Sequence, residues 1–299
     1  MEGLSAMKKM KVKIEGLDVC IYEWGSQRNP TVLLLHGLTN NALGFNEIAD
    51  RLQDHFHLFA IDLPGHGETQ PFNEEKNYSF QFLTEWLEKV RFELSNQPVY
   101  LIGHSWGAAL ALHFSSRFSE MVNGVVMIDG GYLLFEEDPS ITLEEFLKQM
   151  SQWITESYYS TIEEYEKKKK EEIGRWSHEL EQMVHRDMKE VVGGVAMKVN
   201  ENTVRAIGKS LYLESCSDVF HQVQAPTYLI RATLPEDGET IRRQAAARMQ
   251  EELGTHCKVS AIPETGHVLH WQRPEETIKK IKQWLEEKVN EKIYTQAPE

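Results

Sequence analysis

Short runs of apolar residues recur along the chain, separated by stretches whose apolar positions follow helical spacing. A continuous apolar run of this kind is typical of a strand buried on both faces of a parallel sheet. The predicted strands lie at 31–35, 56–61, 99–102, 124–128, 227–230 and 257–262. Predicted helices lie at 42–52, 80–94, 240–253 and 275–289, and one more follows Gly107. Because strand and helix alternate, the pattern predicts an α/β fold with a mostly parallel, doubly wound sheet of about eight strands.

The two ends of the chain depart from this alternation. Residues 11–14 and 19–24 alternate between polar and apolar around a turn at 15–18, which predicts a β-hairpin at one edge of the sheet. At the other end the apolar spacing stops with the last helix. We therefore expect the residues from 290 onward to be frayed.

The alternation is also interrupted between 132 and 215, where no buried strand is evident and the pattern predicts several helices. A charge run at 163–172 is typical of a solvated helix face. Larger side chains in this segment are expected to pack against the core or to line a pocket: Trp153, Tyr158, Tyr159, Trp176, Met183, Met188 and Met197. The chain thus divides into a core at 1–131, a helical insertion at 132–216 and the remainder of the core at 217–299.

Composition narrows the range of partners and compartments. The net charge of -14 argues against nucleic acid and anionic membranes as partners, because both require a basic surface. The three cysteines, Cys20, Cys216 and Cys257, lie far apart and fit neither a disulfide framework nor a zinc site. With no apolar stretch long enough for a signal sequence or a membrane span, we expect a cytoplasmic protein that acts on a small molecule. The pattern leaves the oligomeric state open.

One short motif carries the candidate chemistry. Residues 103–107 read Gly-His-Ser-Trp-Gly and lie between a predicted strand and a predicted helix, so they must form a tight turn with Ser105 at its apex. A G-x-S-x-G turn at such a junction lifts the serine hydroxyl clear of the sheet. Ser105 is therefore the candidate nucleophile.

Four motifs in this order resemble the α/β-hydrolase superfamily. They are His36-Gly37 after a strand, Asp62-Leu63-Pro64-Gly65-His66-Gly67 after the next strand, the turn around Ser105, and Gly266-His267 near the end of the chain. The resemblance covers nearly the whole chain and implies an α/β-hydrolase fold in which residues 132–215 form the cap or lid.

The resemblance also implies roles for individual residues. His267 lies where the family carries its catalytic histidine, and it would accept the proton of Ser105. The backbone amides of Leu38 and Trp106 would form the oxyanion hole. A metal site at His267 and His270 is rejected, because no third ligand accompanies them at useful spacing. No phosphate-binding or dinucleotide-binding motif is present, so no cofactor is expected.

The acid of the triad has two candidate positions. Family members most often place it in the loop after the penultimate strand, but here that position falls on Pro235, with Glu236 and Asp237 just beyond. A minority arrangement places the acid after the preceding strand, where Asp129 follows the run 125–128 directly. We favour Asp129 and keep Glu236 and Asp237 as alternatives.

These residues predict a serine esterase of the carboxylesterase type. It would cleave a small to medium, largely apolar ester through an acyl-enzyme. Other enzymes that share the triad remain open, namely a C–C bond hydrolase, a thioesterase and a cofactor-free peroxidase. A ligand-binding signalling receptor of this fold is an alternative from a different class. Epoxide hydrolase and haloalkane dehalogenase are disfavoured, because they would require aspartate where Ser105 stands.

Overall fold

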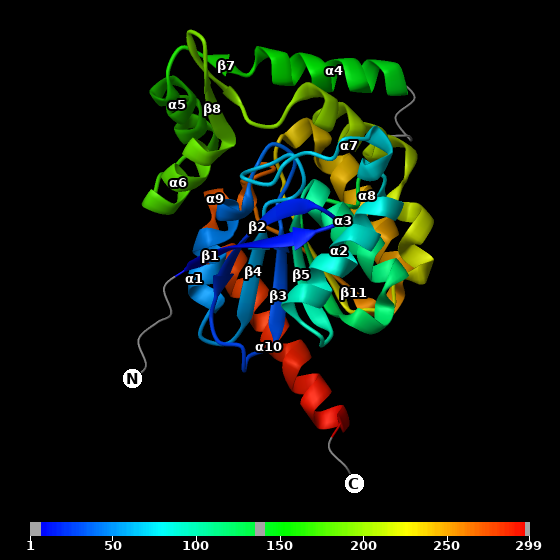
Figure 1. Ribbon diagram of the computed structural model, residues 1–299. Helices are drawn as coiled ribbons and strands as arrows, with labels where there is room; N and C mark the ends of the chain where they lie inside the picture. The colour runs from blue at the N-terminus through cyan, green and yellow to red at the C-terminus, as the bar shows by residue number, and fades with distance from the viewer. Residues whose placement is uncertain (1–6, 135–140, 297–299) are drawn as a thin grey trace.

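The computed structural model describes residues 7–134 and 141–296, and its centre is an eight-stranded sheet (Figure 1). The strands of this sheet are β1 (Lys8–Ile14), β2 (Leu17–Trp24), β3 (Thr31–Leu35), β4 (His57–Ile61), β5 (Val99–His104), β6 (Val122–Ile128), β10 (Thr227–Arg231) and β11 (Cys257–Ala261). Their order in space is β1-β2-β4-β3-β5-β6-β10-β11. Within this sheet β4, β3, β5, β6, β10 and β11 pair in parallel, whereas β1 pairs antiparallel with β2 and β2 antiparallel with β4. The predicted sheet and its edge hairpin are confirmed.

Helices cover both faces of the sheet. They are α1 (Asn46–Leu52), α2 (Phe80–Leu94), α3 (Trp106–Arg117), α8 (Glu239–Leu253), α9 (Leu269–Gln272) and α10 (Pro274–Gln296). Short 3-10 helices are η1 (Ala42–Phe45), η2 (Glu75–Tyr78), η3 (Ser119–Met121), η5 (Cys216–Gln222), η6 (Glu236–Gly238) and η7 (Gly254–His256). Alternate residues of a strand point to opposite faces, so Val32 and Leu34 pack with α1 and α10, while Leu33 and Leu35 pack with α2, α3 and α8.

The insertion lies above one end of the sheet (Figure 1). Its helices are α4 (Leu143–Glu156), α5 (Ile162–Ile173), α6 (His178–Asp187) and α7 (Glu201–Leu213). The charge run lies on α5, where most of its side chains are exposed and only Tyr165 and Ile173 are buried. The prediction of a solvated helix face therefore describes this helix well.

The insertion also contains strands, so the prediction that it is only helical is wrong. A three-stranded antiparallel sheet has the order β7-β9-β8, formed by Tyr158–Tyr159, Gly194–Met197 and Met188–Val191. These strands have two to four residues and are only partly buried, so they lack the continuous apolar run that marks a core strand. The tight turn between β8 and β9 uses Gly193 at a φ of 88°.

The last helix continues well beyond the predicted end. Helix α10 runs from Pro274 to Gln296, so the expectation of fraying from 290 onward is wrong for residues 290–296. The apolar spacing does stop near 289, and Ile293 is exposed. Helical conformation persists because the polar residues that follow are compatible with a helix, and Lys288 pairs with Glu291 at a spacing of three.

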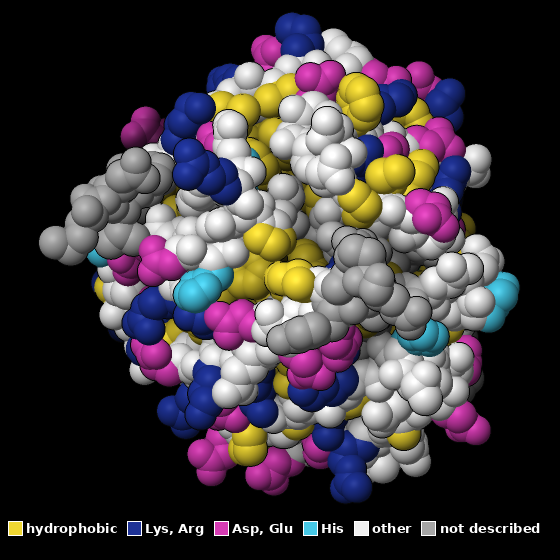
Figure 2. All heavy atoms as spheres, turned by 90° about the horizontal axis from the view of Figure 1, so that it is seen from below, with side chains coloured by type: hydrophobic (Ala, Val, Ile, Leu, Met, Phe, Trp, Pro, Cys, Tyr) yellow, Lys and Arg dark blue, Asp and Glu magenta, His cyan; other side chains and the backbone are white. Residues whose placement is uncertain are grey.

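One face of the surface carries charges of both signs (Figure 2), and the cysteines lie in the interior. Seen from the end opposite the insertion, acidic and basic side chains are interspersed over the surface (Figure 2). Cys20, Cys216 and Cys257 are buried free thiols. Among residues 7–134 and 141–296, no helix combines the length and the apolar character needed to span a bilayer.

Candidate active site

Ser105 occupies a strained turn between β5 and α3. Its φ of 54° and ψ of -119° lie outside the regions that residues with a side chain usually adopt, and surrounding contacts hold the turn in place. The Ser105 amide donates to the carbonyl of Ile128 at 3.0 Å. A Cβ at Gly107 would lie 2.0 Å from the carbonyl oxygen of Leu35, so only glycine allows α3 to start this close to β3.

His267 links Ser105 to Asp129. Its Nε2 lies 2.8 Å from Ser105 Oγ, and its Nδ1 lies 2.8 Å from Asp129 Oδ2. An ionised carboxylate can only accept, so Nδ1 carries the proton and donates it to Asp129. Nε2 is then the acceptor for the Ser105 hydroxyl, which is the arrangement that a general base requires.

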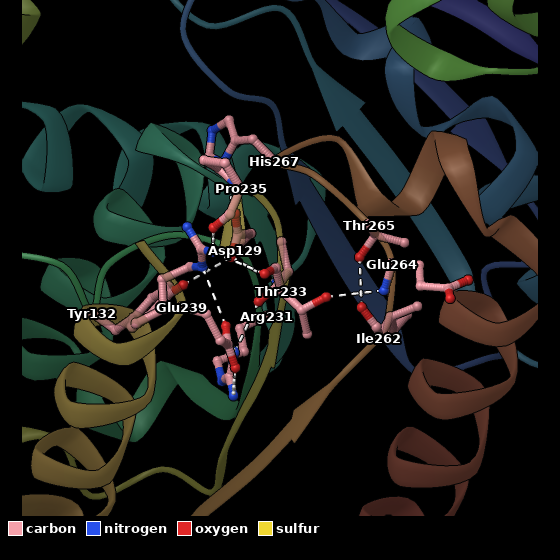
Figure 3. A network of polar contacts seen from close by, with 12 residues as sticks. Asp129, Tyr132, Arg231, Thr233, Pro235, Glu239, Ile262, Glu264, Thr265 and His267 are labelled. Carbon is pink, nitrogen blue, oxygen red and sulfur yellow. Dashed lines mark hydrogen bonds and ion pairs between the residues drawn. The ribbon is translucent and has the colours of Figure 1, made fainter. Parts of the chain in front are cut away.

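Asp129 is held by several donors in a largely buried position (Figure 3). Its Oδ1 accepts from the amide of Ala232 and from the hydroxyl of Tyr132, each at 2.9 Å. Burial alone would raise the pKa of this carboxyl, but the hydrogen bond from His267 and these two donors hold the pKa below its usual value. Asp129 is thus kept as a carboxylate that faces the imidazole.

The structure does not bring the alternative acids to His267. Glu236 and Asp237 are exposed in η6. The loop before them is tied back to α8, because Arg231 at the end of β10 forms a two-pronged ion pair with Glu239 at 2.8 and 2.9 Å (Figure 3).

The loop after β3 lies against Ser105. A Cβ at Gly37 would lie 3.0 Å from Ser105 Cβ, so the amide of Leu38, the next residue, belongs to the same neighbourhood. Trp106 is the first residue of α3, and the first amides of a helix have no partner within the helix. Both backbone groups predicted for the oxyanion hole therefore flank the serine.

Two buried histidines support these loops. His36 donates from Nδ1 to the carbonyl of Gly37 and accepts the amide of Leu63 on Nε2. His66 accepts the amide of Thr39. Burial lowers the pKa of both imidazoles, that of His66 to about 4, so each stays neutral and can accept an amide. These contacts give His36 and His66 a structural role in the loops beside the serine.

Asp62 also holds loops together. Its two oxygens accept the amides of Ala42 and Glu68, at 2.8 and 2.9 Å. The second contact ties Asp62 to its own loop. The first contact extends its role to the start of η1.

His104 and Tyr132 are functional candidates that the sequence interpretation missed. His104 donates from Nε2 to the backbone carbonyl of His267 at 3.0 Å, and burial lowers its pKa well below the usual value. The ring of His270 lies beside it at a tilt of 50°, with ring centroids 4.4 Å apart, and burial lowers the pKa of His270 to about 3. The second position of the Gly-His-Ser-Trp-Gly motif was the only sequence feature that pointed to His104.

A cavity of about 80 Å³ borders Ser105. The core contributes Phe80, Trp106, Ala109 and the turn at 129–131, and Leu133 follows. Across from them lie residues from the end of the insertion and the start of η5, namely Leu211, Glu214, Ser215 and Cys216. This cavity is the space in which a substrate group would meet the serine.

The large side chains of the insertion were expected to pack against the core or to line a pocket, and those that are buried pack against the core. None of those singled out between 153 and 197 is among the described residues that border the cavity beside Ser105. Met183, Met188 and Met197 are buried in the hydrophobic core, and Trp153 and Tyr158 are exposed. The end of α7, rather than α4 to α6, reaches the serine.

A larger cavity, of about 1000 Å³, lies at the opposite end of the sheet. Thr31, His57 and Asn123 border it at the starts of parallel strands, whereas Ser105 follows the end of one. Figure 2 shows this end of the molecule, with hydrophobic side chains in a central hollow. The smaller cavity is the candidate site, because only there do a nucleophile and a base meet.

One group of side chains on the insertion has the donor types of a metal site. Glu166, Glu181 and His185 place ligand atoms within 4.8 Å of one another on α5 and α6. Glu166 is already paired with Lys170 at 2.9 Å and with His185. The group is thus accounted for by ion pairs at the surface.

Comparison with known proteins identifies the family. The family model described as alpha/beta hydrolase fold matches residues 30–274. The chain belongs to this family. The crystal structure of E-2-(acetamidomethylene)succinate hydrolase is similar to this α/β-hydrolase, with a TM-score of 0.77 and 20% identity over 94% of this chain and 99% of that one. At this identity the likeness shows the shared fold.

Two curated relatives extend the comparison. A serine hydrolase-like protein of Mus musculus is 31% identical over 121 residues, which cover 40% of this chain but only 39% of that protein. Epoxide hydrolase 3 of Xenopus tropicalis is 23% identical over 292 residues, covering 93% of this chain and 77% of that protein. The family and these relatives support hydrolytic chemistry in general.

Proposed function

We propose that this α/β-hydrolase cleaves a carboxylic ester through an acyl-enzyme. Ser105 would be the nucleophile, His267 the general base and acid, and Asp129 the residue that orients His267. The observation that carries the proposal is the unbroken hydrogen-bonded chain from Ser105 through His267 to Asp129, beside a cavity of about 80 Å³.

The proposed reaction has two halves. Ser105 Oγ attacks the ester carbonyl carbon as its proton passes to His267 Nε2, and the tetrahedral intermediate then expels the alcohol, which takes that proton. A water molecule next gives a proton to Nε2 and attacks the acyl-enzyme. Collapse of the second intermediate releases the carboxylic acid and returns the proton to Ser105. Asp129 stabilises the imidazolium in both halves.

The amides of Leu38 and Trp106 would stabilise the charge that develops on the carbonyl oxygen. A single donor of this kind contributes roughly 3 kcal/mol to transition-state stabilisation. Their position on either side of Ser105 supports this role. Because both are backbone groups, their contribution is retained in most side-chain variants.

The cavity supports a small substrate group. A water molecule takes up about 30 Å³ in the liquid, so a cavity of about 80 Å³ has room for only three or so heavy atoms. Propionyl or butyryl esters fit this limit, whereas long-chain esters would require the insertion to move. We therefore propose a substrate with a short acyl group, at the small end of the expected size range.

The test combines a covalent probe with an ester panel. Wild type and Ser105→Ala are incubated with a fluorophosphonate, then assayed on p-nitrophenyl esters of increasing acyl length. We expect labelling and turnover of wild type, loss of both in the variant, and an optimum at short acyl chains. A wild-type protein that takes no label would overturn the proposal and favour the ligand-binding alternative.

The same panel separates the other hydrolases. A matched thioester, a β-diketone and styrene oxide are added at equal concentration. We expect the oxygen ester to give the highest kcat/KM, and we expect no epoxide opening because Ser105 stands at the elbow. Faster turnover of the thioester or the β-diketone would reassign the substrate class while leaving Ser105 as nucleophile.

A further inference from the structure

Apart from Asp129 of the proposed triad, one carboxylate residue borders the mainly apolar cavity beside Ser105. Glu214 follows the end of α7 and borders the cavity beside Phe80, Ala109 and Leu211. It is only half-buried, so its charge is not fully screened by solvent. A carboxylate that borders the cavity acts electrostatically on any group that a substrate puts there.

Glu214 is firmly positioned by the start of α2. Its Oε2 accepts the amides of Phe80 and Gln81, at 2.9 and 3.4 Å. Burial raises the pKa of Glu214, while these two amides act in the opposite direction. The N-terminus of a helix also favours a negative charge, so the geometry suits an ionised side chain.

Among the described residues, no lysine or arginine borders the cavity to balance this charge. The other carboxylate that lines it, Asp129, is already bonded to His267. Arg117 lies near Glu214 but donates to Glu85 at 2.7 Å. The charge of Glu214 therefore has no lysine or arginine partner among the described residues of the cavity lining.

We propose that Glu214 determines which substrate group can fill the cavity. A small group that carries a hydrogen-bond donor, such as a hydroxyl or an ammonium, is accepted, whereas a group that carries a carboxylate is rejected. Repulsion between two carboxylates is strong where solvent is partly excluded, and a donor on the substrate would satisfy Glu214 instead. This inference rests on the proposed ester hydrolysis.

The experiment uses two series of esters that differ only in one small group. The acyl series is ethyl butanoate, ethyl β-hydroxypropanoate and monoethyl malonate. The alcohol series is propyl acetate, hydroxyethyl acetate and acetoxyacetate. Each series presents an ethyl, a hydroxymethyl or a carboxylate group at the same place, so the series whose variable group enters the cavity reports on Glu214. Acid release is followed by titration at constant pH.

The variants are Glu214→Gln and Glu190→Gln. Glutamine keeps an oxygen that can accept the amides of α2, so the first change removes the charge and retains the helix contact. Glu190 is exposed on β8 and does not border the cavity, so the second change controls for the overall loss of one negative charge.

In the series whose variable group enters the cavity, we expect wild type to favour the neutral ester over the anionic ester by about 100-fold in kcat/KM. Glu214→Gln should reduce that ratio by at least about tenfold. The hydroxyl ester should lose its advantage over the neutral ester in the same variant. Glu190→Gln should keep the wild-type ratios. A purely structural role for Glu214 would change the rates but not the ratios.

Two outcomes would overturn the inference, and they are distinguishable. If wild type hydrolyses the neutral esters and Glu214→Gln keeps the wild-type ratios in both series, Glu214 only supports α2 and the proposed function stands. If wild type hydrolyses no ester and Ser105 takes no fluorophosphonate, the proposed function fails and the inference fails with it.

Discussion

Asp129 carries the clearest prediction at the level of single residues. Replacing it with asparagine removes the charge that stabilises the imidazolium and allows the wrong tautomer of His267. We expect Asp129→Asn to lower kcat on a short p-nitrophenyl ester by about 10⁴-fold with little change in KM, as in the serine-protease template. Stopped-time assays at high enzyme concentration measure such residual rates.

Matched controls come from the alternative acids. Glu236→Gln and Asp237→Asn change exposed carboxylates in η6, and we expect both variants to retain wild-type kcat. A loss of several orders of magnitude in either one, together with an active Asp129→Asn, would move the acid to the loop after β10. Circular dichroism on all three variants separates catalytic loss from unfolding.

His104 offers a second residue-level prediction, as a positioning residue. Its hydrogen bond to the carbonyl of His267 holds the loop from which that imidazole projects. We expect His104→Ala to lower kcat by roughly ten- to a hundredfold with little change in KM, because small misplacements of a base are costly. His104→Gln retains a donor and should recover part of the rate. As a control, His256→Ala changes an exposed histidine and should leave kcat unchanged. An unchanged kcat in His104→Ala would contradict the positioning role of His104.

At the level of elements, the insertion is joined to the core through a buried polar contact. Asn41, next to η1, donates to Asp187 at the end of α6 at 2.7 Å and to the carbonyl of Met183 at 2.9 Å. Tyr165 of α5 also faces Asp187. Burial raises the pKa of Asp187 to about 7, although Lys169 and Lys198 oppose that shift. One carboxyl at the junction therefore titrates near neutral pH.

This junction predicts a pH dependence of stability. A carboxyl whose pKa is raised from 3.8 to about 7 in the fold binds a proton that the unfolded chain has already released. Rising pH between those values therefore destabilises the fold through Asp187, by roughly 3 to 4 kcal/mol in total. Asp187→Asn removes this dependence, so its free energy of unfolding relative to wild type should rise from pH 4 to pH 8. Urea denaturation across that range measures the difference, and parallel curves would contradict the prediction.

The sequence predicted elements best where a local pattern determines them. The strands and helices of the core follow from apolar runs and helical spacing, and Ser105 and His267 follow from motifs at element ends. The β7-β9-β8 sheet escaped prediction because its strands are short and partly exposed. The acid could not be decided from the sequence, because it depends on which carboxylate meets His267 across 138 residues. Asp129 as the catalytic acid remains a prediction.

At the level of the whole molecule, the sheet is stable only if helices cover both of its faces. Helix α10 closes one face, and its Trp284 is 2% exposed. The Trp284 ring lies 5.9 Å from the ring of Tyr228 on β10, and a Cβ at Gly124 on β6 would lie 2.8 Å from it. One side chain of the last helix thus packs against two neighbouring strands of the sheet, β6 and β10.

This packing predicts that stability and chemistry can be separated. Trp284→Ala leaves a cavity between α10 and the sheet, which typically costs about 3–5 kcal/mol of unfolding free energy. The same truncation at Ile293, which is 61% exposed on the same helix, should stay within about 0.5 kcal/mol of wild type. Below its unfolding temperature, Trp284→Ala should keep the wild-type KM, because α10 contributes no residue to the cavity beside Ser105. Thermal denaturation measures the stability of both variants, and esterase assays below the unfolding temperature measure KM. A changed KM in folded Trp284→Ala would show that α10 shapes the site through the sheet.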